Sequence, residues 1–307
     1  MKPTRSRKTP LSLMTLILTL VSRAEDGCAR TAAERAPARM GDIRPRGEKN
    51  WSVFEATIDR AGQSDLVEYM TAVSKDTQVD WALAAEAGRR KKLLISDMDS
   101  TIIGQECLDE LADFAGLKAE VSAITERAMR GELNFEAALT ERVAMLKGLA
   151  LSALEACYSD RISLNPGARS LVATMKTNGA RCVLVSGGFR FFTSRVAASA
   201  GFHTDRANTL IDDGAALTGE VGMPILGREA KLAALNEESA AIGASPADAI
   251  ALGDGANDLA MIKAAGLGVA YKAKPIVAAE TTARIEHTDL AAALFFQGYA
   301  ESEIVDG

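Results

Sequence analysis

Histidine and cysteine are scarce in this 307-residue chain, which narrows the chemistry open to it. The two histidines, His203 and His287, stand in segments without a nearby nucleophile, so no Ser-His-Asp arrangement can be assembled. The four cysteines form no C-x-x-C pair and no zinc spacing, and Cys182 lies in an apolar run that a strand would bury. We therefore expect free thiols in a reducing compartment.

The chain also lacks an excess of positive charge and a long apolar run. Its 35 lysines and arginines face 41 aspartates and glutamates, a net charge of −6, and the basic residues are scattered. Such a balance creates no field that attracts nucleic acid. The apolar-biased run at residues 11–21 spans about eleven residues, too short to cross a membrane as a helix. We expect neither nucleic acid nor a membrane as partner.

The amino terminus admits two interpretations. Basic residues at positions 2, 5, 7 and 8 precede the run 11–21, which is the layout of a secretory signal, and residues 22–24 could be its cleavage site. The same run contains Ser12, Thr15 and Thr19 and would also serve as the first strand of a small domain. We favour the strand, and with it a cytoplasmic protein. A signal peptide at residues 1–24 and a later start at Met14 stay open.

The pattern of strands, helices and breaks predicts two units. In the first unit, residues 1–88, strands alternate with helices: strands are expected at 13–20, 51–58 and near 79–83, and helices at 28–36 and 64–74. The basic cluster 89–92 is typical of a solvated linker, so we place the boundary there and a second unit at 89–307. That unit begins with the apolar run 93–96, which predicts a buried parallel strand.

The second unit is expected to be α/β with an inserted helical cap. Apolar residues at helical spacing through 108–114, 121–129, 135–146 and 152–158 predict an all-helical insertion at about 105–165. The alternation then resumes with helix 168–178, strand 181–185, a Ser-Gly-Gly turn, helix 191–200 and strands at 249–252, 268–270 and 284–285. A parallel sheet follows, with the cap placed to close over its first strand.

Four carboxylates follow two of these strands, Asp97 and Asp99 after the first and Asp254 and Asp258 after a later one. Packing them together without a cation would be prohibitive. With no histidine or cysteine nearby, magnesium is the expected ion. Each aspartate could instead cap a turn or helix, and for Asp258 we keep a role that supports the metal ligands without binding the ion.

The same segments predict phosphoryl transfer. Asp97 is the expected nucleophile, forming an aspartyl-phosphate, and Asp99 the general acid and base. Ser186 offers a hydroxyl, and the glycine at 187 lets backbone N–H groups approach phosphoryl oxygens at a helix start. Lys231 would supply fixed positive charge to the transition state.

Taken together, Asp97-x-Asp99-Ser-Thr, Ser186-Gly-Gly, Lys231 and Gly253-Asp254-Gly-x-Asn257-Asp258 resemble the haloacid dehalogenase superfamily and, within it, the phosphoserine phosphatase family. The resemblance runs from about residue 91 to 285. It implies a Rossmann-like sheet with a helical-bundle cap. It also implies magnesium held by Asp97, Asp254 and the backbone carbonyl of Asp99, with Gly187 and Asn257 among the substrate-binding residues.

The resemblance extends into the cap. Glu106 and Arg142 match family positions that grip the substrate's ammonium and carboxylate, and a buried glutamate would select a free amino group. Met129 and Phe135 match apolar positions that pack over the substrate. The implied reaction is hydrolysis of O-phospho-L-serine, the last step of serine biosynthesis. Residues 1–88 would be an ACT-like regulatory or dimerising domain, with which a homodimer is compatible.

Two other functions are considered. A receiver domain that stores phosphate on Asp97 is disfavoured, because it needs a stable acyl phosphate and not a resident acid and base such as Asp99. A related phosphatase or phosphotransferase acting on another small phosphomonoester stays open.

Gly253-x-Gly255 could begin a dinucleotide fingerprint, but Asp258 stands where the third glycine belongs.

Overall fold

The computed structural model describes residues 15–36, 42–46, 49–59, 63–129 and 132–307. The chain divides into two compact units. One comprises Met1–Lys91 with Thr282–Ile304, and the other Lys92–Thr281 with Val305–Gly307. Both ends of the chain therefore contribute to the first unit, whereas the sequence had suggested that residues 282–304 belong with the second.

The first unit is a mainly antiparallel sheet covered by two helices. Its strand order is β2-β3-β1-β4-β12. Leu16, Leu18 and Leu20 alternate along β1 and share one core with side chains of both helices. The elements are β1 (Thr15–Arg23), α1 (Cys28–Arg35), β2 (Arg44–Pro45), β3 (Trp51–Asp59), α2 (Gln63–Thr77), β4 (Asp80–Ala85) and β12 (Ala283–Ile285).

The strand predicted near the amino terminus is present as β1, which is described from Thr15 onwards and ends at Arg23, three residues later than expected. Residues 1–14 lie outside the described part of the chain. Among the described residues, no helix is both long and apolar enough to cross a membrane. Whether the first unit is ACT-like in function stays a prediction.

The carboxyl-terminal segment packs onto the first unit's sheet. Helix α12 (Ala292–Phe296) is entirely buried and contacts β1 and β4. The Phe295 ring lies 5.0 Å from that of Trp51. Arg89 donates hydrogen bonds to the carbonyl oxygens of Phe295 and Phe296 at 3.1 and 2.9 Å. The last helix is thus tied to the first strands by packing and by hydrogen bonds.

The second unit contains a parallel sheet in the order β11-β10-β5-β6-β7. Every residue of the central strand β5 and of its neighbour β10 is buried, as expected for parallel strands covered on both faces. Its elements are β5 (Leu93–Ser96), α7 (Ala168–Thr177), β6 (Arg181–Phe189), α8 (Arg190–Ala200), β7 (Thr204–Asn208), α9 (Arg228–Ala241), β10 (Ala249–Gly253), α10 (Leu259–Ala264), β11 (Leu267–Tyr271) and α11 (Pro275–Ala278).

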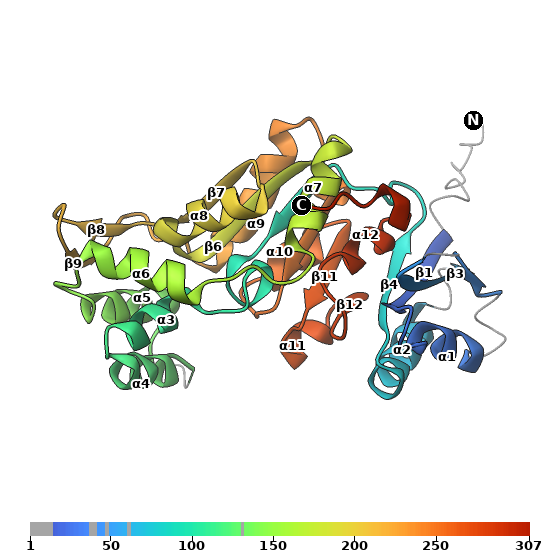
Figure 1. Cartoon of the computed structure of the whole chain (residues 1–307), viewed down its shortest axis with the longest axis horizontal. Coiled ribbons are helices and arrows are strands. Elements are labelled where there is room, and N and C mark those ends of the chain that lie inside the picture. The colour runs from blue at the N-terminus through green and yellow to red at the C-terminus, as the bar shows by residue number, and fades with distance from the viewer. Residues whose placement is uncertain (1–14, 37–41, 47–48, 60–62, 130–131) are drawn as a thin grey trace, which may run out of the picture. The chain divides into compact units, whose positions relative to one another are not determined.

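The predicted helical insertion is confirmed between β5 and β6. It comprises α3 (Cys107–Phe114), α4 (Lys118–Met129), α5 (Phe135–Ala144) and α6 (Leu151–Arg161), drawn in green in Figure 1. Beside it lies a hairpin of β8 (Leu210–Asp212) and β9 (Leu217–Val221), which the sequence had not indicated. The Gly148 N–H donates to the Leu217 carbonyl at 2.8 Å, joining cap and hairpin.

Two local expectations are wrong. Residues 186–188 continue strand β6 instead of ending it in a turn, although the register with β7 shifts between Val185 and Phe189 and the Ser186 hydroxyl accepts the Gly188 N–H at 2.8 Å. Strand β12 is part of the first unit, where Ala283 and Arg284 pair antiparallel with β4. This pairing satisfies backbone groups on the side of β4 opposite β1.

The role of Arg89 in joining the two chain ends can be tested against its neighbour. Arg89 is largely buried and also pairs with Glu55, whereas Arg90 is exposed and pairs with the exposed Glu303. We expect R89A to lower the free energy of unfolding of the first unit by about 2 kcal/mol or more, since it strands buried acceptors. R90A should change it by less than about 1 kcal/mol. Urea titration followed by tryptophan fluorescence measures both, and equal effects would contradict the assignment.

Candidate active site

The two predicted catalytic loops begin at neighbouring strands. Asp97 directly follows β5, and its N–H donates to the Leu252 carbonyl of β10 at 3.0 Å. Asp254 directly follows β10. Asp97 is 5% exposed, and its Oδ1 accepts the Met98 N–H at 2.8 Å, which starts the short helical turn η4 (Met98–Ile102). Both carboxylates thus stand at the carboxyl ends of parallel strands, where open α/β sheets bind ligands.

Lys231, from helix α9, forms ion pairs with a carboxylate of each of these loops. Its Nζ lies 2.8 Å from Oδ2 of Asp97 and 2.6 Å from Oδ1 of Asp258, and the side chain is almost completely buried. Burial lowers the pKa of Lys231, but the charges of Asp97 and Asp258 outweigh it, so the net shift is upward. The amine therefore keeps its charge and fixes the orientation of both carboxylates.

Close packing around Asp258 explains the glycine at the end of β10. A Cβ on Gly253 would lie 2.4 Å from the Asp258 Cγ, which no side chain could tolerate without moving the carboxylate. The second oxygen of Asp258 accepts the Gly255 N–H at 3.1 Å. Both Asp258 oxygens are thus engaged by the protein itself.

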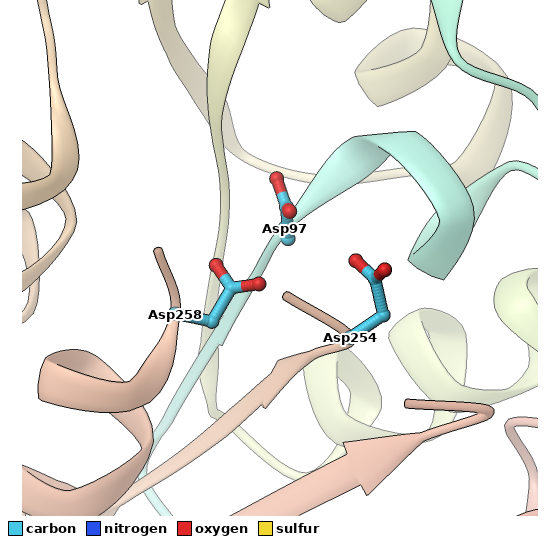
Figure 2. A group of neighbouring side chains, drawn as sticks. All are labelled: Asp97, Asp254 and Asp258. Atoms are coloured by element: carbon cyan, nitrogen blue, oxygen red, sulfur yellow. The ribbon is translucent and has the colours of Figure 1, made fainter. Parts of the chain in front are cut away.

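Asp97, Asp254 and Asp258 form a candidate metal site. One oxygen from each lies within 4.8 Å of the others, and Figure 2 shows the three side chains converging. Burial and the charge of Asp258 raise the pKa of Asp97, and they raise that of Asp254 to about 6. An all-oxygen donor set with this unrelieved repulsion fits a hard cation. Lys231 and a backbone N–H group engage the two oxygens of Asp97 and likewise those of Asp258, so Asp254 has the most coordinating capacity left of the three.

Asp99 faces a different set of groups. Its Oδ2 accepts the Ser186 hydroxyl at 3.2 Å and its Oδ1 accepts the Cys107 N–H at 2.9 Å. Burial and the nearby charge of Glu106 raise the pKa of Asp99 to about 6. A carboxyl group that titrates near neutrality can both donate and accept a proton, as an acid and base must.

A cavity of about 140 Å³ opens above these carboxylates, smaller than pockets that hold drug-sized ligands. Its wall brings together most of the residues predicted from the sequence: Asp97, Asp99, Glu106, Phe135, Arg142, Ser186, Gly187, Asp254 and Asn257. Lys231 forms an ion pair with Asp97, and an oxygen of Asp258 lies within 4.8 Å of an Asp97 oxygen. The side chain of Met129 lies outside the described part of the structure.

The cap contributes one acidic and one basic group to the cavity. Glu106 is exposed, contrary to the expectation that it is buried, because it precedes α3 at the cavity rim. Arg142 is partly buried, and burial lowers its pKa although the charges of Asp109 and Glu106 oppose this. Among the residues that the structure describes, no carboxylate forms an ion pair with Arg142, whose Nε donates to the Ala138 carbonyl at 3.3 Å.

Phe135 reaches from the cap to the sheet. Its Cζ lies 3.2 Å from the position that a Cβ would take on Gly187, and its ring also borders Gly227. The side chain is 39% exposed. The ring therefore forms a side wall, and a larger residue at 187 would push it away.

Some residues of the cavity wall were not predicted from the sequence. Leu108, Leu139 and Phe189 line it, and so does Lys274, whose Nζ is 3.9 Å from Oδ2 of Asp254. Lys274 follows β11 closely, so the rule that ligands bind at the carboxyl ends of strands would have pointed to it.

Sequence comparison now decides the family. A model of haloacid dehalogenase-like hydrolases matches residues 94–263, more than half of the chain. The chain belongs to this family. The aspartates, Ser186 and Lys231 described above all fall within the matched residues.

Within the haloacid dehalogenase-like family, the similar proteins carry related names. A phosphoserine phosphatase from a Polaromonas species is 50% identical over 191 residues, covering 61% of this chain and 81% of that protein. A probable phosphoserine phosphatase from Schizosaccharomyces pombe is 36% identical and covers 86% of this chain and 89% of its own length. The crystal structure of a haloacid dehalogenase family hydrolase from Salmonella enterica serovar Typhi has a TM-score of 0.81 at 30% identity, covering 92% and 98% of the two chains.

The raised pKa of Asp254 predicts that replacing this residue stabilises the metal-free protein at neutral pH and destabilises the metal-bound protein. Because its folded pKa of about 6 exceeds the unfolded value, the stability it contributes when protonated is lost as pH rises through about 6. In the presence of a chelator, we expect the free energy of unfolding of D254N, relative to that of the parent, to rise by about 2 kcal/mol between about pH 4.5 and about pH 7. With saturating magnesium at neutral pH, the parent should be more stable than D254N.

A matched control is D213N in the β8–β9 turn. Backbone N–H groups of Ala216 and Ala215 hold the pKa of the exposed Asp213 below its usual range. Its contribution is therefore lost as pH falls, and magnesium should not alter it. Urea unfolding of the three proteins measures the differences, and a parallel pH response of D254N and D213N would refute the metal-site electrostatics.

Proposed function

We propose that the protein hydrolyses O-phospho-L-serine to L-serine and phosphate through an aspartyl-phosphate on Asp97, with magnesium as its cofactor. The names of the two relatives support this substrate. The oxygen-only donor set of Asp97 and Asp254 supports magnesium over softer metals. By family resemblance the backbone carbonyl of Asp99 completes the protein ligands.

The guanidinium of Arg142, which has no ion-pair partner among the described residues, is the observation that carries the choice of substrate. It lines the same small cavity as Glu106 and the nucleophile. A partly buried cation without a carboxylate partner is stabilised by an anionic ligand, and a guanidinium suits a carboxylate in a bidentate geometry. Phosphate at Asp97, ammonium at Glu106 and carboxylate at Arg142 together describe a small phosphorylated amino acid.

The residues divide the reaction between them. An Asp97 oxygen attacks phosphorus, the bond from phosphorus to the serine oxygen breaks, and Asp99 donates its proton to the departing alkoxide. Water then attacks the aspartyl-phosphate while Asp99 recovers a proton, releasing phosphate. Lys231 keeps Asp97 oriented, and Ser186 and the Gly187 backbone bind phosphoryl oxygens. Bound magnesium supplies positive charge at those oxygens and offsets the carboxylates.

Several further expectations belong to this proposal. The protein acts in the cytoplasm, in the last step of serine biosynthesis. Residues 1–88 form an ACT-like regulatory or dimerising domain, and the assembly is compatible with a homodimer. The sequence of strands and helices in the first unit supports a separate module. The alternative is a related phosphatase or phosphotransferase with another small phosphomonoester as substrate.

Phosphate release from L-phosphoserine tests the function. We expect turnover that requires magnesium and exceeds turnover of phosphothreonine and phosphohomoserine. D97N should abolish it, because an amide cannot attack phosphorus, and should leave the circular dichroism spectrum unchanged. D99N should be slower by about 10²-fold or more. Full activity of D97N would eliminate Asp97 as the nucleophile.

Substrate choice should depend on Arg142. We expect R142A to raise KM for phosphoserine by about tenfold or more, because it removes a charge-assisted contact to the carboxylate. The KM for phosphoethanolamine, which has the amine but no carboxylate, should change little. R161A, an exposed arginine of α6 paired with Asp113, is the control variant and should alter neither constant. Equal losses on both substrates would make Arg142 a structural residue.

A further inference from the structure

Ser100 adopts a backbone conformation that its side chain disfavours. Its φ and ψ are 53° and 7°, in the left-handed region, and it lies one residue after Asp99. A non-glycine residue stays in this region where surrounding contacts demand it, and such residues gather at functional sites. We therefore expect Ser100 to make a contact that compensates for the cost of this conformation.

That contact is with Glu106. The Ser100 hydroxyl donates to Oε1 of Glu106 at 2.6 Å, and the Ser100 N–H donates to the Gln105 carbonyl at 3.2 Å. Among the described residues, nothing else donates a hydrogen bond to the Glu106 carboxylate. An exposed glutamate otherwise samples many rotamers, so the serine fixes a side chain that would move freely.

We propose that Ser100 is a positioning residue that makes the site selective for substrates with a free amino group. The inference rests on the proposed function. The hydroxyl holds one oxygen of Glu106 at the cavity rim and leaves Oε2 to receive the ammonium. Substrate binding then does not have to order the glutamate, which is the usual benefit of preorganisation.

Two substitutions remove the hydroxyl with opposite effects on the backbone. S100A keeps the Cβ and its strain, whereas S100G adopts a positive φ freely, so failure to fold is not at issue for it. Both should raise KM for L-phosphoserine by about threefold to tenfold, as expected for one lost hydrogen bond. Values of kcat should stay within about twofold. S100T retains the hydroxyl and should restore the parental KM, even if its β-branched side chain lowers the melting temperature.

The readout is the ratio of kcat/KM for L-phosphoserine to that for 3-phosphooxypropanoate, which lacks the amine. We expect the ratio to fall in S100G and S100A and to stay parental in S100T. In an E106A background, S100G should change the ratio no further, because the two residues act through one contact. A ratio that stays parental in S100G, or an S100G effect that persists in E106A, overturns the assignment.

The outcomes separate this inference from the proposed function. If the parent protein does not prefer L-phosphoserine to 3-phosphooxypropanoate, the proposed substrate is wrong and the role of Ser100 falls with it. If the parent shows the preference and S100G retains it, the substrate stands and only the role of Ser100 is refuted. Equal losses on both substrates in S100G would instead assign Ser100 to the support of Asp99.

Discussion

The buried amine of Lys231, held between Asp97 and Asp258, is the interaction on which the active site depends. Each partner alone would be an uncompensated charge inside the protein. Together they connect helix α9 with the loops after β5 and β10, so three separate parts of the chain are fixed relative to the reacting carboxylate. Lys231 offsets only one of the two charges, so one negative charge of this pair remains together with those of Asp99 and Asp254, and a proton and a divalent cation would neutralise the three. The negative charge that Lys231 does not offset is thus the charge that the reaction uses.

Much of the second unit could be predicted from the sequence because its signals are local. Strand β5 is a continuous apolar run, and the cap helices repeat apolar residues at helical spacing, so their bounds differ from expectation by a few residues. In a parallel sheet, loops after neighbouring strands meet at one edge. The aspartates after β5 and β10 therefore had to converge, although how each would hydrogen-bond was not readable.

The features that were missed depend on partners distant in the sequence. Residues 186–188 resemble a turn by composition, but β6 continues through them and pairs again with β7 at Phe189. Burial of Glu106 was inferred from its assumed role, whereas its exposure follows from where α3 begins. The β8–β9 hairpin is short and contacts the cap through Gly148, a contact that no local pattern encodes.

The division of the first unit between the two ends of the chain has a consequence for biosynthesis. A ribosome releases β1 to β4 long before residues 282–304, which supply β12 and the buried helix α12. Until then the sites on β1 and β4 that receive α12 have no covering from this segment. The unit that is begun first is therefore completed only after nearly all of the phosphatase unit, residues 92–281, has been synthesised.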